Sequence, residues 1–393
     1  MVKSIVSRYG WSFAWVMVFG SWAAPGATHA FAPGALATAA RARGFEVGAA
    51  IDHDLSAARL ALAAQEFTSA TPENSFKWQE LSPSSGAYDF SNADVAIDWA
   101  EQNGLRIRGH TLFWVRLNGL PAWVEPEVNA APDPAAHLTQ LMETHAQTVV
   151  GRYAGRIAQW DIVNEPLEEF GPNFDPKNFF FQTLGEQYLD IAFHAAHAAD
   201  PAAKLFLNET LVENLPEKLP GLISIVQGML ARGVPIHGIG LQGHFLFLPP
   251  DPATLRQQIQ QIAALGLLVE LTEVDIRTPL FEGAPDPLLE QAEAYRDVVG
   301  ICLQFAACTG LTTWGIDDGD TWLDSFWFTQ PDAPNRPLLF DDALQPKAAY
   351  DAVVTLLFAP VPVLSPIATG LLVTALMLSG MRHLRRSGRR GAA

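Results

Sequence analysis

Cysteine, charge and internal repetition are all scarce in this chain of 393 residues. It has two cysteines and no glycine at every third position, which excludes disulfide-rich scaffolds and collagen-like proteins. Charged residues make up 17% of the chain, below the roughly 25% of an average soluble domain. The hydrophobic content of 49%, with Trp and Phe spread along the chain, excludes intrinsic disorder.

Basic residues are the scarcer kind of charge, 25 against 42 acidic ones, and seven of them lie at the two ends. Residues 1–30 hold only Lys3 and Arg8, and residues 361–393 hold five arginines and no acid. The segment between them therefore has a net charge of −24. Such a surface repels phosphate groups, so we expect no nucleic-acid partner.

Residues 1–30 have the pattern of a secretory signal peptide. A short basic start precedes an uncharged apolar run, and small residues lead to a cleavage site near Ala30. The alternative interpretation is an N-terminal membrane anchor. Secretion would place the protein in an oxidising compartment.

The C-terminal segment, residues 361–393, has the pattern of a second targeting signal. Residues 352–381 are uncharged, and the five arginines follow. A Pro-containing motif at 361–366, an apolar stretch and a basic tail resemble the tripartite sorting signals that bacterial exosortase-type proteases read. A plain membrane anchor at the tail is the alternative. We expect a secreted bacterial protein at the cell surface or outer envelope, with a sorting protease as a partner.

Between these ends, strand-like apolar runs alternate with helix-like stretches, and no long linker interrupts them. This alternation predicts an α/β fold, a single (β/α)8 TIM barrel occupying residues 31–360. No extended coiled-coil pattern indicates an oligomer, so we expect a monomer. The eight predicted strands are 45–51, 67–71, 106–112, 159–163, 205–208, 238–242, 267–272 and 311–314.

Two glutamates stand where the fourth and seventh predicted strands end. Catalytic groups of such barrels lie at the carboxyl ends of the strands. Glu165 and Glu273 are 108 residues apart, about three βα units, which places them across the mouth of the barrel. Facing carboxylates are what hydrolysis of a glycosidic bond requires: one protonates the leaving oxygen, and the other attacks or guides water.

Five motifs carry a resemblance to glycoside hydrolase family 10, which consists mainly of endo-β-1,4-xylanases on (β/α)8 barrels. The similarity spans roughly residues 45–355. It implies a retaining xylanase in which Glu165 is the general acid and base and Glu273 the nucleophile. The motifs are TPEN (71–74), RGHTLFW (108–114), WDIVNE (160–165), GIGLQGH (238–244) and TEVD (272–275).

The resemblance also implies roles for neighbouring side chains. Asn164 would contact the 2-hydroxyl of the reacting sugar, and His244 would bridge Glu273 and Asp275. It implies a disulfide between Cys302 and Cys308, two free thiols being the alternative. We expect no metal site and no cofactor. The implied substrate-binding residues are Glu73, Asn74, Lys77, His110, Trp114, Gln242, Trp314 and Trp322.

The chain departs from the family pattern in three places. Residues 115–121 replace the usual His-Ser-Gln-Leu-Pro, and Asn118 is the candidate for the missing glutamine. Thr210 and Leu211 follow Asn208 and Glu209 where the family has an aromatic residue, which predicts that an aromatic wall on the leaving-group side is absent. Residues 324–337 form a longer loop rich in Phe and Pro.

Two other functions fit the sequence. One is a retaining β-1,4-glycanase that acts on cellulose or mixed-linkage glucan. The other is a surface polysaccharide-binding protein that has lost catalysis, although the presence of both glutamates with Asn164, His244 and Asp275 speaks against it.

Overall fold

The computed structural model describes residues 31–116, 119–325 and 334–360. The proposed signal peptide and sorting segment, Asn118, and residues 326–333 of the expected loop at 324–337 lie outside these residues. No helix among the described residues has the length and apolar character needed to span a membrane. The strands are β1 (Glu46–Ile51), β2 (Ser69–Pro72), β3 (Arg106–Gly109), β4 (Gln159–Asn164), β5 (Lys204–Glu209), β6 (Gly238–Leu241), β7 (His244–Phe245), β8 (Leu268–Ile276) and β9 (Cys308–Thr313).

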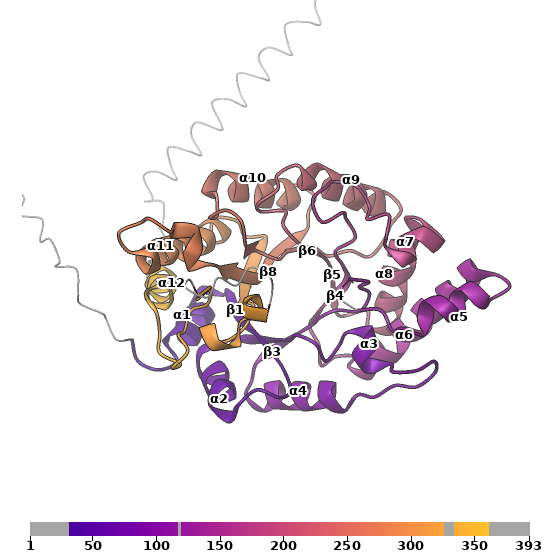
Figure 1. Ribbon diagram of the computed structural model, residues 1–393, viewed down its shortest axis with the longest axis horizontal. Helices are drawn as coiled ribbons and strands as arrows, with labels where there is room; N and C mark the ends of the chain where they lie inside the picture. The colour runs from indigo at the N-terminus through magenta and orange to yellow at the C-terminus, as the bar shows by residue number, and fades with distance from the viewer. Residues whose placement is uncertain (1–30, 117–118, 326–333, 361–393) are drawn as a thin grey trace, which may run out of the picture. The chain divides into compact units, whose positions relative to one another are not determined.

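Helices lie between consecutive strands of the barrel and surround them in Figure 1. The α-helices are α1 (Ala35–Arg43), α2 (Ala57–Glu66), α3 (Trp78–Leu81), α4 (Ser91–Gln102), α5 (Val124–Ala130), α6 (Pro134–Arg152), α7 (Phe179–Leu184), α8 (Gln187–Ala199), α9 (Lys218–Ala231), α10 (Pro252–Ala263), α11 (Pro287–Cys302) and α12 (Ala348–Phe358). The short 3-10 helices are η1 (Thr278–Phe281), η2 (Asp318–Asp320) and η3 (Trp322–Ser325).

Eight of the strands form a closed parallel barrel. Each pairs with its neighbour in the order β1 to β6, then β8 and β9, and β9 pairs back onto β1. This confirms the predicted (β/α)8 barrel. All eight predicted strands are present, with ends that differ by a few residues, and β8 and β9 are the seventh and eighth of the barrel.

The short strand β7 has no counterpart in the prediction. It pairs with the carboxyl end of β8, so that His244 lies opposite Asp275 and Phe245 opposite Ile276. A two-residue strand gives no periodic signal in a sequence. Its effect is to bring His244 beside the end of β8, where Glu273 also lies.

Three helices begin with the same pair of residues, Asp followed by Pro. Asp133, Asp251 and Asp286 each precede the proline that starts α6, α10 or α11, and each carboxylate accepts a hydrogen bond from a backbone N–H of the first turn. Proline is suited to this position because its missing N–H would have no partner there. Such a cap stabilises a helix by about 1 kcal/mol, so the sequence itself fixes where these helices start.

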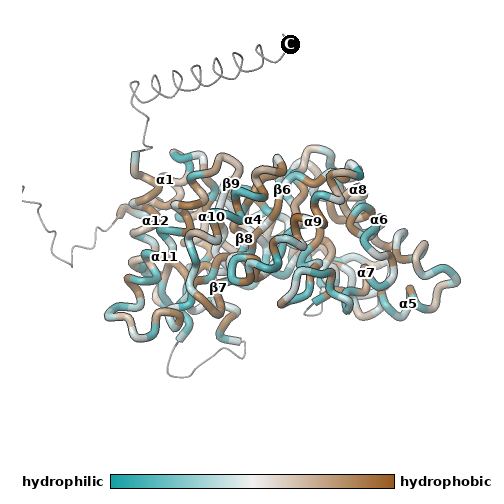
Figure 2. Tube along the Cα trace, turned by 90° about the horizontal axis from the view of Figure 1, so that it is seen from above, coloured by the Kyte–Doolittle hydropathy of each residue, from teal (hydrophilic) through white to brown (hydrophobic). Residues whose placement is uncertain are grey.

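The apolar core packs between the barrel and its helices. A Cβ on Gly109 would lie 2.1 Å from the Trp160 ring, so glycine lets the buried indole sit against β3. Figure 2 shows hydrophobic stretches alternating with hydrophilic ones along the chain, as expected for amphipathic helices on a barrel. A disulfide between Cys302 and Cys308 joins the end of α11 to the start of β9.

Candidate active site

Eleven of the thirteen side chains that the sequence analysis assigns to catalysis or substrate binding line one cavity of about 230 Å³. The cavity lies at the carboxyl ends of the strands. The other two, Asp275 and Asn74, lie one contact behind it: Asp275 contacts His244, and Asn74 accepts a hydrogen bond from Lys77. The eleven are Glu73, Lys77, His110, Trp114, Asn164, Glu165, Gln242, His244, Glu273, Trp314 and Trp322.

Glu273 is held by a donor on each carboxylate oxygen. Asn208 Nδ2 donates to Oε1 at 2.6 Å, and His244 Nε2 lies 3.1 Å from Oε2. The other ring nitrogen of His244 lies 2.8 Å from Asp275 Oδ2. Burial alone would lower the pKa of His244, but the hydrogen bonds to Asp275 and Glu273 outweigh it and raise the pKa to about 10. A histidine protonated at neutral pH donates to both carboxylates.

Glu165 has a different environment. Gln242 Nε2 donates to Oε1 at 3.0 Å, while Oε2 lies 3.7 Å from Arg116 Nη1. The backbone φ of Glu165 is 53°, a left-handed conformation that is rare outside glycine, and its N–H donates to the carbonyl of Asn208. Backbone strain of this kind persists where the surroundings enforce it, which is frequent at active sites. It turns the carboxylate at the end of β4 toward the cavity.

Asn208 links the two halves of the site, although the sequence analysis gave it no role. Its Nδ2 donates to Asn164 Oδ1 at 2.8 Å as well as to Glu273, and its Oδ1 accepts from Thr272 Oγ1 at 2.7 Å. A Cβ on Gly240 would lie 2.1 Å from this Oδ1, so glycine leaves the space that the Asn208 amide occupies. The sequence offered one signal for Asn208: it is the penultimate residue of β5 and therefore lies close to the mouth of the barrel.

The side chains after β2 form a second polar group. Lys77 Nζ donates to Asn74 Oδ1 at 2.6 Å and lies 5.0 Å from the centre of the Trp114 ring. Asn74 in turn donates to Asp52 Oδ2 at 2.7 Å. Asp52 was not predicted. Burial raises the pKa of Glu73 to about 6, and the positive charge of Lys77 opposes that shift.

Below the cavity, the inside of the barrel holds buried ion pairs. Arg108 is buried and pairs with Asp161 and with Glu270, whose Oε2 lies 2.7 Å from Nη1. Asp161 also lies 3.0 Å from Nδ1 of His110. Buried charges persist when they are paired in this way. The network orients His110 at the base of the cavity and was missed in the sequence analysis.

Tryptophan rings enclose the cavity. The Trp322 indole N–H donates to Asp275 Oδ2 at 2.7 Å, and its ring centre lies 5.1 Å from that of His244. Trp314 meets His110 edge to face at 5.0 Å. Trp78 and Trp160 are buried in the core. Among the described residues, no group of three or more His, Cys, Asp or Glu side chains is arranged to hold a metal ion.

Three residues from the segments that depart from the family pattern line this cavity, namely Arg116, Thr210 and Leu211. Arg116 donates to the Leu167 carbonyl at 2.6 Å and to Asp175 at 3.2 Å, which holds its guanidinium near Glu165. Leu211 packs with Leu246, which also lines the cavity.

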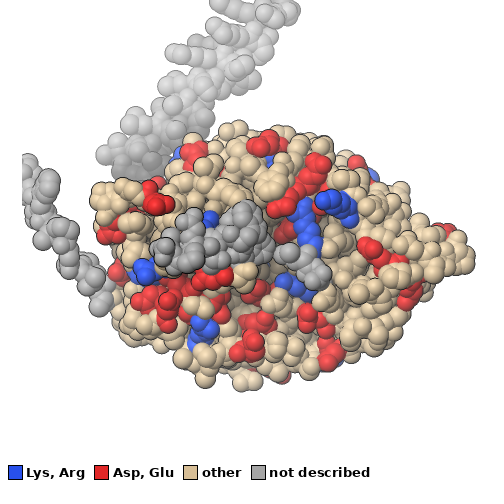
Figure 3. Space-filling view, viewed as in Figure 1, with Lys and Arg blue, Asp and Glu red and all other residues tan. Residues whose placement is uncertain are grey.

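Figure 3 shows acidic side chains more abundant than basic ones on the face in view.

A parallel barrel with two glutamates at the carboxyl ends of opposite strands, enclosed by indoles and amides, defines a glycoside hydrolase. The comparisons with known proteins give the family. The Glycosyl hydrolase family 10 model matches residues 35–356. The chain therefore belongs to glycosyl hydrolase family 10 and is an enzyme.

Relatives of known sequence and structure cover most of the chain. Endo-1,4-beta-xylanase B of Paenibacillus barcinonensis is 34% identical over 326 residues, 81% of this chain and 97% of the relative. Beta-1,4-xylanase of Dictyoglomus thermophilum is 37% identical, covering 79% and 88%. The crystal structure of xylanase 10B from Thermotoga petrophila RKU-1 in complex with xylobiose matches with a TM-score of 0.75 and 30% identity, covering 82% of this chain and 96% of that one.

Proposed function

We propose that the protein is a retaining endo-β-1,4-xylanase that cleaves internal bonds of xylan by double displacement. The observation that carries the proposal is the unequal environment of the two glutamates. Glu273 accepts hydrogen bonds on both oxygens from Asn208 and His244, which orients an ionised carboxylate for attack. Glu165, on the facing strand, is the proposed acid and base. The xylanases that match the chain support the choice of substrate.

The proposed reaction has two steps. In the first, Glu165 protonates the glycosidic oxygen while a Glu273 oxygen attacks the anomeric carbon, forming a covalent glycosyl–enzyme and releasing the leaving-group sugar. In the second, Glu165 removes a proton from water, which attacks the same carbon and frees Glu273. Two inversions leave the configuration unchanged. Asn164, whose Oδ1 accepts from Asn208, presents its amide to the 2-hydroxyl beside the reacting carbon.

The remaining site residues bind the sugars around the reacting bond. Glu73, Lys77, His110 and Gln242 supply hydrogen bonds from the wall of the cavity, and Asn74 positions Lys77 from behind it. Trp114, Trp314 and Trp322 supply flat apolar faces. Indole rings suit this role because they combine large apolar area with one polar N–H.

The choice between xylan and a glucan depends on one substituent. Xylose lacks the hydroxymethyl group of glucose, and we propose that Trp322, fixed by its hydrogen bond to Asp275, crowds that group. Initial rates on xylan and on carboxymethyl cellulose test this. Faster cleavage of the cellulose derivative would favour a glucanase, and binding without release of reducing sugar would favour a binding protein.

We also propose that the enzyme is exported as a monomer, with residues 1–30 removed, residues 31–360 forming the catalytic domain and residues 361–393 serving as a sorting or anchoring segment. The charge pattern of the two ends supports export and anchoring. Mass spectrometry of the protein recovered from the cell envelope would locate both mature ends. An intact N-terminus in that protein would contradict the proposal.

A further inference from the structure

Two phenylalanine side chains are exposed beside the active-site cavity. Phe170 follows β4, five residues after Glu165, and Phe247 follows β7, three residues after His244. Their side chains are 60% and 40% exposed, and their ring centres lie 6.4 Å apart. A pair of exposed aromatic rings bordering a binding site is a common sign that the surface contacts a ligand.

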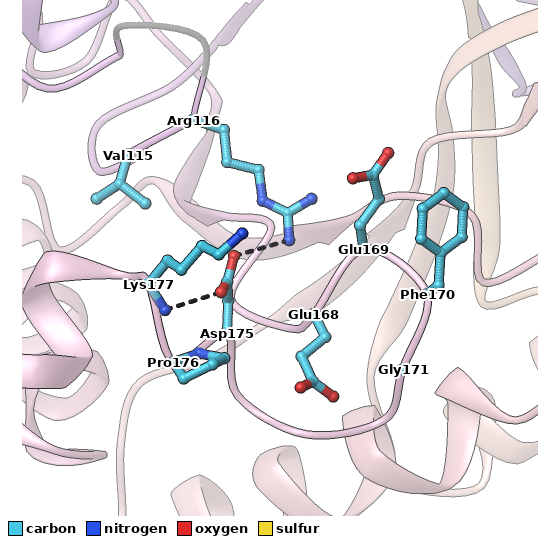
Figure 4. A pocket seen from close by; sticks show the side chains of 9 residues that line it. All are labelled: Val115, Arg116, Glu168, Glu169, Phe170, Gly171, Asp175, Pro176 and Lys177. Carbon is cyan, nitrogen blue, oxygen red and sulfur yellow. Dashed lines mark hydrogen bonds and ion pairs between the residues drawn. The ribbon is translucent and has the colours of Figure 1, made fainter.

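The two rings border one continuous path that leads away from the catalytic glutamates. Phe247 lines the cavity that contains Glu165 and Glu273. Phe170 lines a neighbouring cavity of about 620 Å³, shown in Figure 4. Arg116 and Glu169 line both cavities, so the second continues the first on the side of Glu165.

The charges of the second cavity indicate what kind of molecule it takes. Figure 4 shows Arg116 and Lys177 facing Glu169 and Phe170 across it. Its cations are outnumbered by the carboxylates of Glu168, Glu169 and Asp175, so an anion is disfavoured. The cavity thus offers hydrogen-bond donors and acceptors beside an aromatic ring. This combination suits a neutral molecule with many hydroxyls and an apolar face, which is a sugar.

The apolar surface beneath Phe247 explains why the aromatic contact lies here. At the end of β5, where an aromatic wall was expected to be absent, Leu211 forms a buried cluster with Leu246 and Leu323. This cluster supports the segment that carries Phe247. The flat faces thus come from the loops after β4 and β7 instead of the loop after β5.

We propose that Phe170 and Phe247 form the binding surface for the sugar residues on the leaving-group side of the cleaved bond. The inference rests on the proposed function, in which Glu165 protonates the oxygen of that leaving group. The occupants are neutral xylosyl residues whose apolar faces pack on the two rings. These two residues, from the loops after β4 and β7, therefore replace the aromatic wall that the family has after the fifth strand and that this chain was predicted to lack.

The test compares two substrates with the double variant Phe170→Ala/Phe247→Ala. Cleavage of xylotetraose into two xylobioses releases a leaving group of two sugars, whereas β-xylobiosyl fluoride releases a fluoride ion. The variant should lose about tenfold more kcat/KM on xylotetraose than on the fluoride, since one aromatic contact contributes up to about a tenfold factor.

Phe358→Ala is the matched control. Phe358 ends α12 and is 49% exposed. It lies at the other end of the barrel, because its neighbour Ala359 accepts a hydrogen bond from Arg43, which precedes β1. The Phe358→Ala variant should leave the ratio of kcat/KM on the two substrates unchanged. An equal loss on both substrates in the double variant, or no loss on either, would overturn the inference. A wild-type chain that cleaves neither substrate would refute the proposed function itself, a result distinct from either of these.

Discussion

Nε2 of His244 lies 3.1 Å from Oε2 of Glu273. His244 is buried, and its second nitrogen lies 2.8 Å from Asp275 Oδ2, so the protonated ring donates one N–H to each of the two carboxylates. The carboxylate that attacks the sugar is therefore oriented by a cation that is itself held in place. The rotamer of Glu273 is fixed before substrate binds, which lowers the cost of reaching the attacking geometry.

His244→Gln should lower kcat by about 10²-fold, because Glu273 loses a charged donor.

The same variant should also change how the stability of the protein depends on pH. The folded-state pKa of His244, about 10, lies above the ordinary value of 6.5. The folded state therefore keeps the proton longer than the unfolded chain, and its contribution to stability is lost as pH rises from about 7 to 10. Chemical denaturation across this range should show a smaller decline for His244→Gln. An identical decline would contradict the role of His244.

Glu165→Gln and Glu273→Gln should each abolish xylan cleavage while leaving the fold intact. General acid and base catalysis contributes about 10²–10⁴-fold, and loss of the nucleophile removes the covalent route altogether. Release of reducing sugar measures the activity, and circular dichroism with thermal melting checks the fold. Full activity in either variant would show that the reacting groups have been misassigned.

Asn208→Ala should lower kcat/KM on xylan by about 10²-fold, because a buried donor to Glu273 is lost. Gly240→Ala should reproduce part of that loss from a different strand, since its Cβ would displace the Asn208 amide. A crystal structure of either variant would show whether the Glu273 carboxylate has rotated. Unchanged activity in both would mean that His244 alone orients the nucleophile.

Glu213→Gln should stabilise the protein above pH 7 and have little effect at pH 4. Burial raises the pKa of Glu213 to about 7, and no partner of Oε2 is found among the described residues. The folded state holds this proton more tightly than the unfolded chain, so the wild type loses stability as pH rises from about 4.5 to 7. The gain at pH 8 should be on the order of 3 kcal/mol. Denaturant unfolding measures it, with the exposed Glu217→Gln as control. A gain that is the same at both pH values would exclude this cause.

The sequence predicted the barrel because its signals are local. Apolar runs of strand length, the helix-like stretches between them, and polar residues at strand ends each depend on a few neighbouring positions. Glu165 and Glu273 could be found in the same way. Parallel strands of a closed barrel bring their carboxyl ends together whatever lies between them in the chain.

The contacts missed from the sequence all depend on the direction of a side chain inside the barrel. Arg108 and Asp161 are charged residues that periodicity alone would place in solvent, yet they pair in the interior. Asn208, on β5, donates to Asn164 on β4 and to Glu273 on β8, and these contacts exist only once the three strands lie together in the fold. Phe170 and Phe247 are 77 residues apart, and no local pattern connects two loops at that separation.

The most direct test of the central claim is the configuration of the first product. Residues 31–360 would be incubated with xylan and the early xylo-oligosaccharides followed by anomeric NMR before mutarotation. Double displacement by Glu165 and Glu273 predicts that the β-anomer forms first. An initial α-anomer would contradict the account, because it would mean that Glu273 activates water and forms no bond to the sugar.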